Sequence, residues 1–96
     1  MIDFLKKANI SDEVILSIMN NYNDAILYNL SCNADNCLEI INYLKELNIE
    51  VIDELLLNRI DLFLNTKEDI VKKFSKYNIP LVVDLINDDY ITIDKI

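Results

Sequence analysis

The chain has 96 residues, 52% of them hydrophobic, and its 17 acidic residues outnumber its 9 basic residues to give a net charge of −8. This length suits one domain with a modest core, and the apolar content excludes an intrinsically disordered chain. Proteins that bind nucleic acid or anionic lipid need a basic surface, so the charge argues against both as main partners. A basic protein is the partner that it favours.

The composition also bears on location and source. No apolar run approaches the roughly 20 residues that a membrane-spanning helix needs. The N-terminus does not read as a signal peptide, because Asp3 interrupts it and no long apolar segment follows. We therefore expect a cytoplasmic protein. The abundance of Ile, Asn, Lys and Asp, with few Arg and Ala residues, is typical of an AT-rich genome such as that of a low-GC bacterium or its phage.

The first third of the chain predicts a short helix and then a long one. Residues Asp3–Ala8 form the short helix. Ser11 is a good N-cap for the long helix, with two acids in the first turn behind it. Apolar residues then recur at three- and four-residue spacing over residues 15–30. The asparagine-rich stretch 20–24 leaves open whether this helix bends or breaks.

The middle third predicts two further helices. Residues 31–36 read as a loop, and Asn36 with Glu39 three residues later resembles a capping box. The helix that begins there runs to Leu47. Another helix follows the pair Asn48-Ile49 and has acidic residues in its first turn.

The last third predicts a connector and two helices. Residues 62–64 are very apolar and suit a single helical turn. Thr66 is the N-cap of the next helix. The buried stripe of this helix is expected to be Ile70, Val71, Phe74 and Tyr77. Pro80 then lies in the first turn of another helix, where its missing N–H is not needed.

The C-terminal residues 90–96 alternate loosely like a strand. No other segment predicts a strand that could pair with them, so we favour a short helical turn and keep a lone strand as the alternative. Ile91, Ile93 and Ile96 are apolar. They either fold back onto the core or cover a partner or a second copy, which leaves a homodimer through this end of the chain open.

The pair Asn-Ile follows an amphipathic segment three times, at Asn9-Ile10, Asn48-Ile49 and Asn78-Ile79. A helix often ends with a residue in the left-handed conformation at the C′ position, and Asn is the natural choice in a chain without glycine. In such a turn the following residue packs on the helix five residues earlier. The expected contacts are Ile10 on Leu5, Ile49 on Leu44, and Ile79 on Phe74.

These units predict an all-α fold with internal repeats. Five to six short helices would form a compact, solenoid-like stack of helical hairpins within a single domain of residues 1–96. The repeat-like units end at the three Asn-Ile pairs. Repeat proteins of this kind usually present interaction surfaces rather than catalytic sites.

Within residues 43–79, Arg59, Leu62 and Leu64 form a connector that is followed by the helix capped by Thr66. On these residues the segment resembles a repeat of the mitochondrial transcription termination factor (mTERF) family, which has an Arg-x-Pro-x-Leu-Leu-like connector followed by a capped helix. Ile60 stands near the position of the family's Pro, and Asn takes the place of its usual Gly. The resemblance implies a curved helical solenoid that binds nucleic acid through a basic concave face.

The composition lacks residue types that most catalytic and metal-binding sites require. Without His the chain cannot form a Ser-His or Cys-His pair or a Cys/His zinc site on its own, and without Gly it has no phosphate-binding loop. Cys32 and Cys37 are expected as reduced thiols, with at least one of them in the core. We therefore expect no enzymatic activity, no cofactor and no metal site.

Two functions remain as hypotheses. The first is a small acidic protein-interaction module that regulates or inhibits a basic nucleic-acid-binding partner. Its expected contact residues are Glu50, Asp53, Glu54, Asp84, Asp88 and Asp89. The alternative is an mTERF-like protein that binds nucleic acid through lysines on the helix of residues 67–76.

Overall fold

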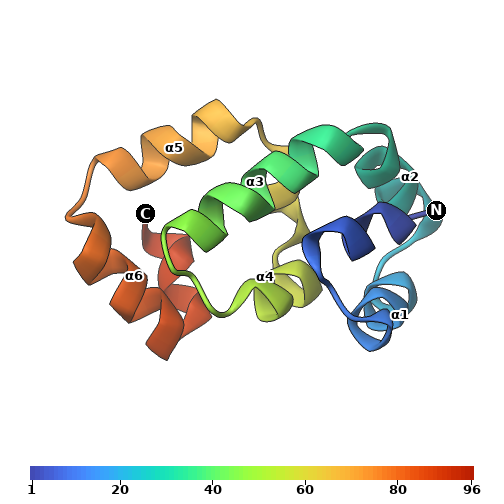
Figure 1. Ribbon diagram of the computed structural model, residues 1–96, viewed down its shortest axis with the longest axis horizontal. Helices are drawn as coiled ribbons and strands as arrows, with labels where there is room; N and C mark the ends of the chain where they lie inside the picture. Colours follow the sequence, from blue (N-terminus) through green and yellow to red (C-terminus); the bar gives the residue numbers. More distant parts are fainter.

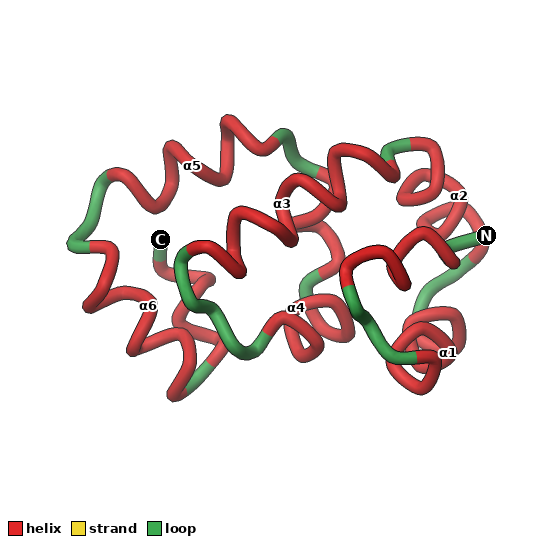
Figure 2. The backbone as a smooth tube through the Cα atoms, viewed as in Figure 1, coloured by secondary structure: helices red, strands yellow, loops and turns green.

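The computed structural model describes residues 1–96 and contains only helices (Figures 1 and 2). There are six α-helices and three 3₁₀-helices, and the molecule measures 36 × 24 × 21 Å along its principal axes. In chain order the helices are η1 (Asp3–Ala8), α1 (Asp12–Asn21), α2 (Asp24–Cys32), α3 (Ala34–Glu46), α4 (Ile52–Asn58), η2 (Ile60–Leu64), α5 (Lys67–Ser75), α6 (Ile79–Asp88) and η3 (Tyr90–Lys95). The all-α prediction is confirmed.

Helix α3 is the central element of the packing. It contacts η1, α2, η2 and α5, while α4 packs against α1 and η2 (Figure 1). Helix α6 lies at one end of the molecule and contacts α5 and η3. The last segment therefore folds back onto α6. Of the three isoleucines expected to fold onto the core, Ile93 is buried and Ile96 is partly buried, whereas Ile91 is 51% exposed.

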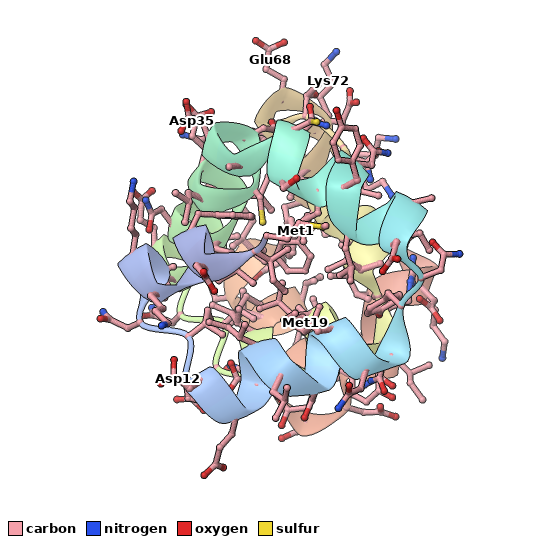
Figure 3. All side chains as sticks on the ribbon, turned by 90° about the vertical axis from the view of Figure 1, so that its right-hand side faces the viewer. Met1, Asp12, Met19, Asp35, Glu68 and Lys72 are labelled. Atoms are coloured by element: carbon pink, nitrogen blue, oxygen red, sulfur yellow. The ribbon has the colours of Figure 1, made fainter.

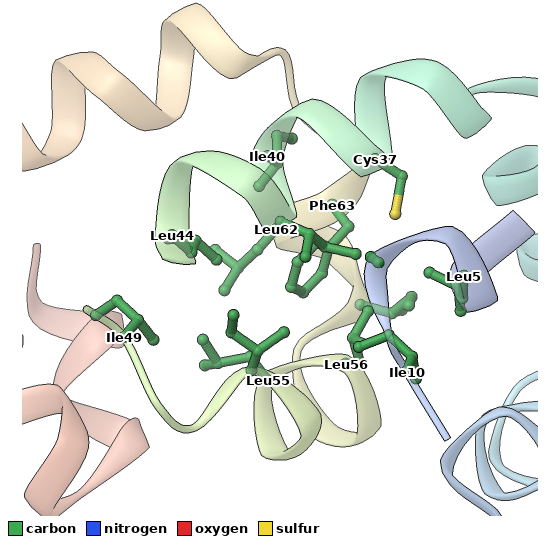
Figure 4. Close-up of a cluster of buried hydrophobic side chains, with 14 of the residues drawn as sticks. Leu5, Ile10, Cys37, Ile40, Leu44, Ile49, Leu55, Leu56, Leu62 and Phe63 are labelled. Atoms are coloured by element: carbon green, nitrogen blue, oxygen red, sulfur yellow. The ribbon is translucent and has the colours of Figure 1, made fainter. Parts of the chain in front are cut away.

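The core is formed entirely by apolar side chains. All 25 buried residues are hydrophobic, and no polar or charged residue is buried. Figure 4 shows a central part of this cluster, in which α3, α4 and η2 contribute facing side chains. Its labelled members are Leu5, Ile10, Cys37, Ile40, Leu44, Ile49, Leu55, Leu56, Leu62 and Phe63. Burial of aliphatic and aromatic area is thus the main stabilising term.

The long helix expected over residues 15–30 is broken into α1 and α2. Tyr22 and Asn23 have extended backbones, and the Asn23 Oδ1 accepts a hydrogen bond of 2.9 Å from the Ile26 N–H at the start of α2. The Tyr22 hydroxyl donates to the Leu57 carbonyl oxygen at 2.8 Å. The break therefore gives α2 a capped start and directs Tyr22 onto the end of α4.

The predicted loop at residues 31–36 is wrong. Helix α2 continues to Cys32 and α3 begins at Ala34, so only Asn33 separates them. The capping box is wrong as well, because Asn36 lies inside α3 and its Nδ2 donates to the Asn65 carbonyl oxygen. The Asn36 side chain, which the local pattern predicted to cap the helix, instead bonds to a distant segment.

Two of the three Asn-Ile turns form as predicted. Asn9 and Asn48 are the only residues with positive φ, at 63° and 68°. The N–H of Ile10 donates to the Leu5 carbonyl oxygen at 3.3 Å, and the N–H of Ile49 donates to the Leu44 carbonyl oxygen at 3.0 Å. These are the bonds of a Schellman turn, and both isoleucines are buried.

The third Asn-Ile turn is wrong. Asn78 has φ −70° and is the N-cap of α6, where its Oδ1 accepts from the Leu81 N–H at 3.2 Å. Helix α5 ends at Ser75, too early for Asn78 to be its C′ residue, and Ile79 is only partly buried. Pro80 fixes the start of α6 and so decides the role of Asn78.

The remaining predicted elements are mostly confirmed. Ser11 and Thr66 accept N-cap bonds of 3.2 Å, and residues 62–64 belong to the 3₁₀-helix η2. The C-terminal segment is the helical turn η3, so the strand alternative is wrong. The expected stripe of α5 is wrong at Tyr77, which is 43% exposed and lies beyond the end of the helix.

Candidate functional site

The six acidic residues expected to bind a partner all lie exposed on the surface. Glu50 is in the segment between α3 and α4, followed by two acids in the first turn of α4; the others are on or directly after α6. None of them forms an ion pair. The charges of these six residues are therefore free to meet a partner. Some of the six also stabilise the start of a helix.

Asn87 brings the segment before α4 and helix α6 together. Its Nδ2 donates to the Asn48 carbonyl oxygen at 3.0 Å, and its Oδ1 accepts from the Glu50 N–H at 2.7 Å. A side-chain amide can satisfy one backbone acceptor and one backbone donor in this way. These two hydrogen bonds hold the segments together, although they are nearly forty residues apart in the chain.

A shallow groove lies along this junction. Acidic side chains from both segments line it, together with an apolar surface from α6 and the end of α3. The lining residues are Glu46, Leu47, Asn48, Glu50, Ile79, Pro80, Val83, Asp84 and Asn87. We call this set the acidic groove. It unites two of the predicted residues, Glu50 and Asp84, and adds Glu46 and Asn87, which sequence reasoning missed.

The other four predicted acids are not part of the acidic groove. Asp53 and Glu54 occupy the first turn of α4, where negative charge stabilises the helix dipole. Asp89 caps η3, because its Oδ1 accepts from the Ile91 N–H at 3.1 Å. Asp88 ends α6 on the negative side of the dipole, and no helix-stabilising role explains it.

The basic residues are distributed quite differently. Lys67, Lys72 and Lys76 are exposed on or just after α5, and Figure 3 shows Lys72 and Glu68 pointing away from the core. The single arginine is engaged by two carboxylates, since Arg59 pairs with Asp61 at 3.0 Å and also with Asp94.

The hydrogen bond and charge of Arg59 lower the pKa of Asp61, although partial burial opposes the shift. Arg59 thus joins η2 to the C-terminal η3. The Arg59 guanidinium therefore has a structural role in linking two helices. The exposed positive charge on and just after α5 comes from its lysines.

The cysteines differ in exposure. Cys37 is buried against the core, and burial raises the pKa of its thiol to about 12, so it stays protonated at neutral pH. Cys32 is exposed at the end of α2, and the two form no disulfide. No three His, Cys, Asp or Glu side chains gather closely enough to hold a metal ion. None of the helices has the length and apolar character to cross a membrane.

Comparisons with protein-family models, with curated proteins and with solved structures gave no match to this chain.

Proposed function

We propose that this chain is a small, acidic, non-enzymatic protein-interaction module that binds a basic protein and regulates or inhibits its binding of nucleic acid. The observation that supports the proposal is the acidic groove, where Glu46, Glu50 and Asp84 flank an apolar surface and lack ion-pair partners. A partner that neutralises these acids with Lys or Arg would use residues that it also needs for phosphate contacts.

Charge alone would bind such a partner weakly. An exposed ion pair contributes about 0–1 kcal/mol, so affinity requires apolar contact as well. The acidic groove supplies both, because the partly exposed Leu47 and Ile79 lie among its carboxylates. The net charge of −8 would speed the encounter with a basic partner and make the association sensitive to salt.

The proposal is tested with a helical peptide of lysine and alanine as a basic probe. We expect salt-sensitive binding that weakens several-fold in the variant Glu50→Gln/Asp84→Asn. Asp35→Asn/Glu39→Gln is the matched control, because it removes the same charge from exposed positions of α3 away from the acidic groove. Equal losses in the two variants would show that only net charge matters. Absence of salt-sensitive binding would refute the proposal.

The alternative function is nucleic-acid binding through α5, as the mTERF resemblance implies. It is supported by the exposed Lys67, Lys72 and Lys76 on one stretch of chain. A gel shift at low salt with duplex and single-stranded probes separates the two functions. Retardation that disappears in Lys72→Glu/Lys73→Glu would favour the alternative and contradict the first proposal.

We also propose that the chain is built from repeated units. The order helix, helix, 3₁₀-helix occurs as α3-α4-η2 and again as α5-α6-η3. Helix α3 contacts both η1 and α5, and each of these three elements precedes one of the Asn-Ile pairs. The Schellman turns at Asn9 and Asn48 are equivalent positions of two units. In a solenoid each unit stacks on its neighbours in this manner.

A further inference from the structure

Helix α6 carries two exposed leucines on its outward side. Val82, Val83 and Ile86 are buried, but Leu81 and Leu85 on the opposite side are 58% and 46% exposed. The outward side of a surface helix is normally polar, and here two large aliphatic side chains lie one turn apart among its polar residues. These two leucines therefore point to contact with another surface.

Two acids lie on this same outward side. Asp84 and Asp88 are four residues apart, and each stands three residues after one of the exposed leucines, which places all four side chains on adjoining rows of the helix. Neither acid is ion-paired, and α6 contains no basic residue. We call Leu81, Asp84, Leu85 and Asp88 the α6 face.

We propose that the α6 face docks an amphipathic helix of a partner protein, in which aliphatic residues are flanked by Lys or Arg. This inference rests on the proposed function and names the structural class of its partner. The aliphatic side chains would cover Leu81 and Leu85, and the basic ones would meet Asp84 and Asp88. In this mode of recognition the partner helix presents aliphatic anchors three and four residues apart to an apolar surface, and Leu81 and Leu85 supply that surface.

Charge decides against a second copy of this chain as the occupant. Two α6 faces in contact would bring together four Asp side chains of the same sign, with no base on either helix to compensate them. Like charges brought together in a forming interface weaken the association. A basic helix docked on one α6 face turns its two carboxylates, Asp84 and Asp88, into favourable contacts.

Helix α1 offers a natural control surface. Leu16 and Met19 are 58% and 42% exposed there, close to the values on the α6 face. Of the two acids one turn before Leu16, Asp12 is ion-paired with Lys6 at 3.3 Å and only Glu13 is unpaired. Leu16 and Met19 thus have similar apolar exposure beside a single free carboxylate, whereas the α6 face has two.

The experiment titrates the full chain with a synthetic amphipathic helix of leucine and lysine. A leucine–glutamate peptide of the same pattern and the lysine–alanine peptide serve as comparison probes. We expect the leucine–lysine peptide to bind most tightly. Its affinity should fall at least tenfold in Leu81→Ser/Leu85→Ser and severalfold in Asp84→Asn/Asp88→Asn. The variant Leu16→Ser/Met19→Ser should bind like the wild type. All these positions are exposed, and circular dichroism verifies that each variant is folded.

The outcomes separate the two proposals. If the lysine–alanine and leucine–lysine peptides both bind but Leu81→Ser/Leu85→Ser leaves the affinity for the leucine–lysine peptide unchanged, the docking site is overturned while the acidic module stands. If neither basic peptide binds, both proposals fail. Equal loss in the α1 control, or tight binding of the leucine–glutamate peptide, overturns the docking site. Light scattering that shows a dimer dependent on Leu81 and Leu85 assigns the face to a second copy and overturns it too.

Discussion

Threonine substitutions at Asn48 and Asn78 distinguish the two roles that asparagine has in the turns of this chain. Asn48 has φ 68° and sits in the left-handed region, whereas Asn78 has φ −70° and accepts an N-cap bond through its side chain. A β-branched residue tolerates the first conformation poorly and suits the second. The same chemical change should therefore have very different effects on stability.

The magnitudes follow from these two geometries. Placing an ordinary L-residue in the left-handed region costs about 1–2 kcal/mol, and threonine lies at the upper end because its branched Cβ crowds the backbone. At Asn78 the threonine hydroxyl replaces the amide oxygen as the cap, so Asn78→Thr should cost only a few tenths of a kcal/mol. Asn78→Ala, which removes the acceptor, should cost about 1 kcal/mol.

Urea unfolding monitored by circular dichroism measures the difference. We expect Asn48→Thr to lower the midpoint with no change in the slope of the transition, and to lower the melting temperature by roughly 4–8 °C per kcal/mol. Asn48→Gly should be neutral or stabilising, since glycine enters the left-handed region freely. Equal destabilisation by threonine at both positions, or a larger loss at Asn78, would refute this assignment of the turns.

Three further predictions concern stability and reactivity. Tyr22→Phe removes the hydroxyl that donates to the end of α4 and should cost about 1 kcal/mol in the free energy of unfolding, with Tyr28→Phe, which is exposed, as a silent control. Arg59 lowers the pKa of Asp61, so the pair stabilises the fold above pH 3.8, which is the ordinary pKa of Asp. This stabilisation is lost as the pH falls through the lower pKa that Asp61 has in the folded protein. The difference in unfolding free energy between wild type and Arg59→Gln should therefore shrink in acid and in high salt. A thiol reagent should modify Cys32 in the folded protein but Cys37 only at the rate of unfolding, and fast labelling of both would contradict the buried, protonated thiol.

The features that could be predicted from sequence are those decided within a few residues. Ser11 and Thr66 act as caps because their acceptors reach a backbone N–H three residues away. Asn9 and Asn48 are similar, since the helix that they end lies directly before them. Asn78 could have ended α5 as a C′ residue or begun α6 as an N-cap, and in the structure it is the N-cap of α6.

The features that escaped prediction depend on contacts between distant segments. Asn36 has the pattern of a cap, but its amide is used by the Asn65 carbonyl oxygen far along the chain. The acidic groove is of the same kind, because the sequence names Glu50 and Asp84 as acids but holds no signal that Asn87 joins their segments. The exposure of Leu81 and Leu85 likewise depends on which helices surround α6.

The wholly apolar core has a consequence for the uniqueness of the fold. Aliphatic cores tolerate repacking and lose a single defined arrangement before they lose stability. Here the directional restraints between distant segments lie at the periphery. Besides the Arg59–Asp94 ion pair, they include four hydrogen-bonding side chains, namely the Tyr22 hydroxyl, the amides of Asn36 and Asn87, and the Lys45 ammonium that donates to the Ala8 carbonyl oxygen. A variant lacking all four should remain helical and compact while its NMR spectrum loses dispersion. In this small protein, the core supplies cohesion and a few surface hydrogen bonds select the native packing.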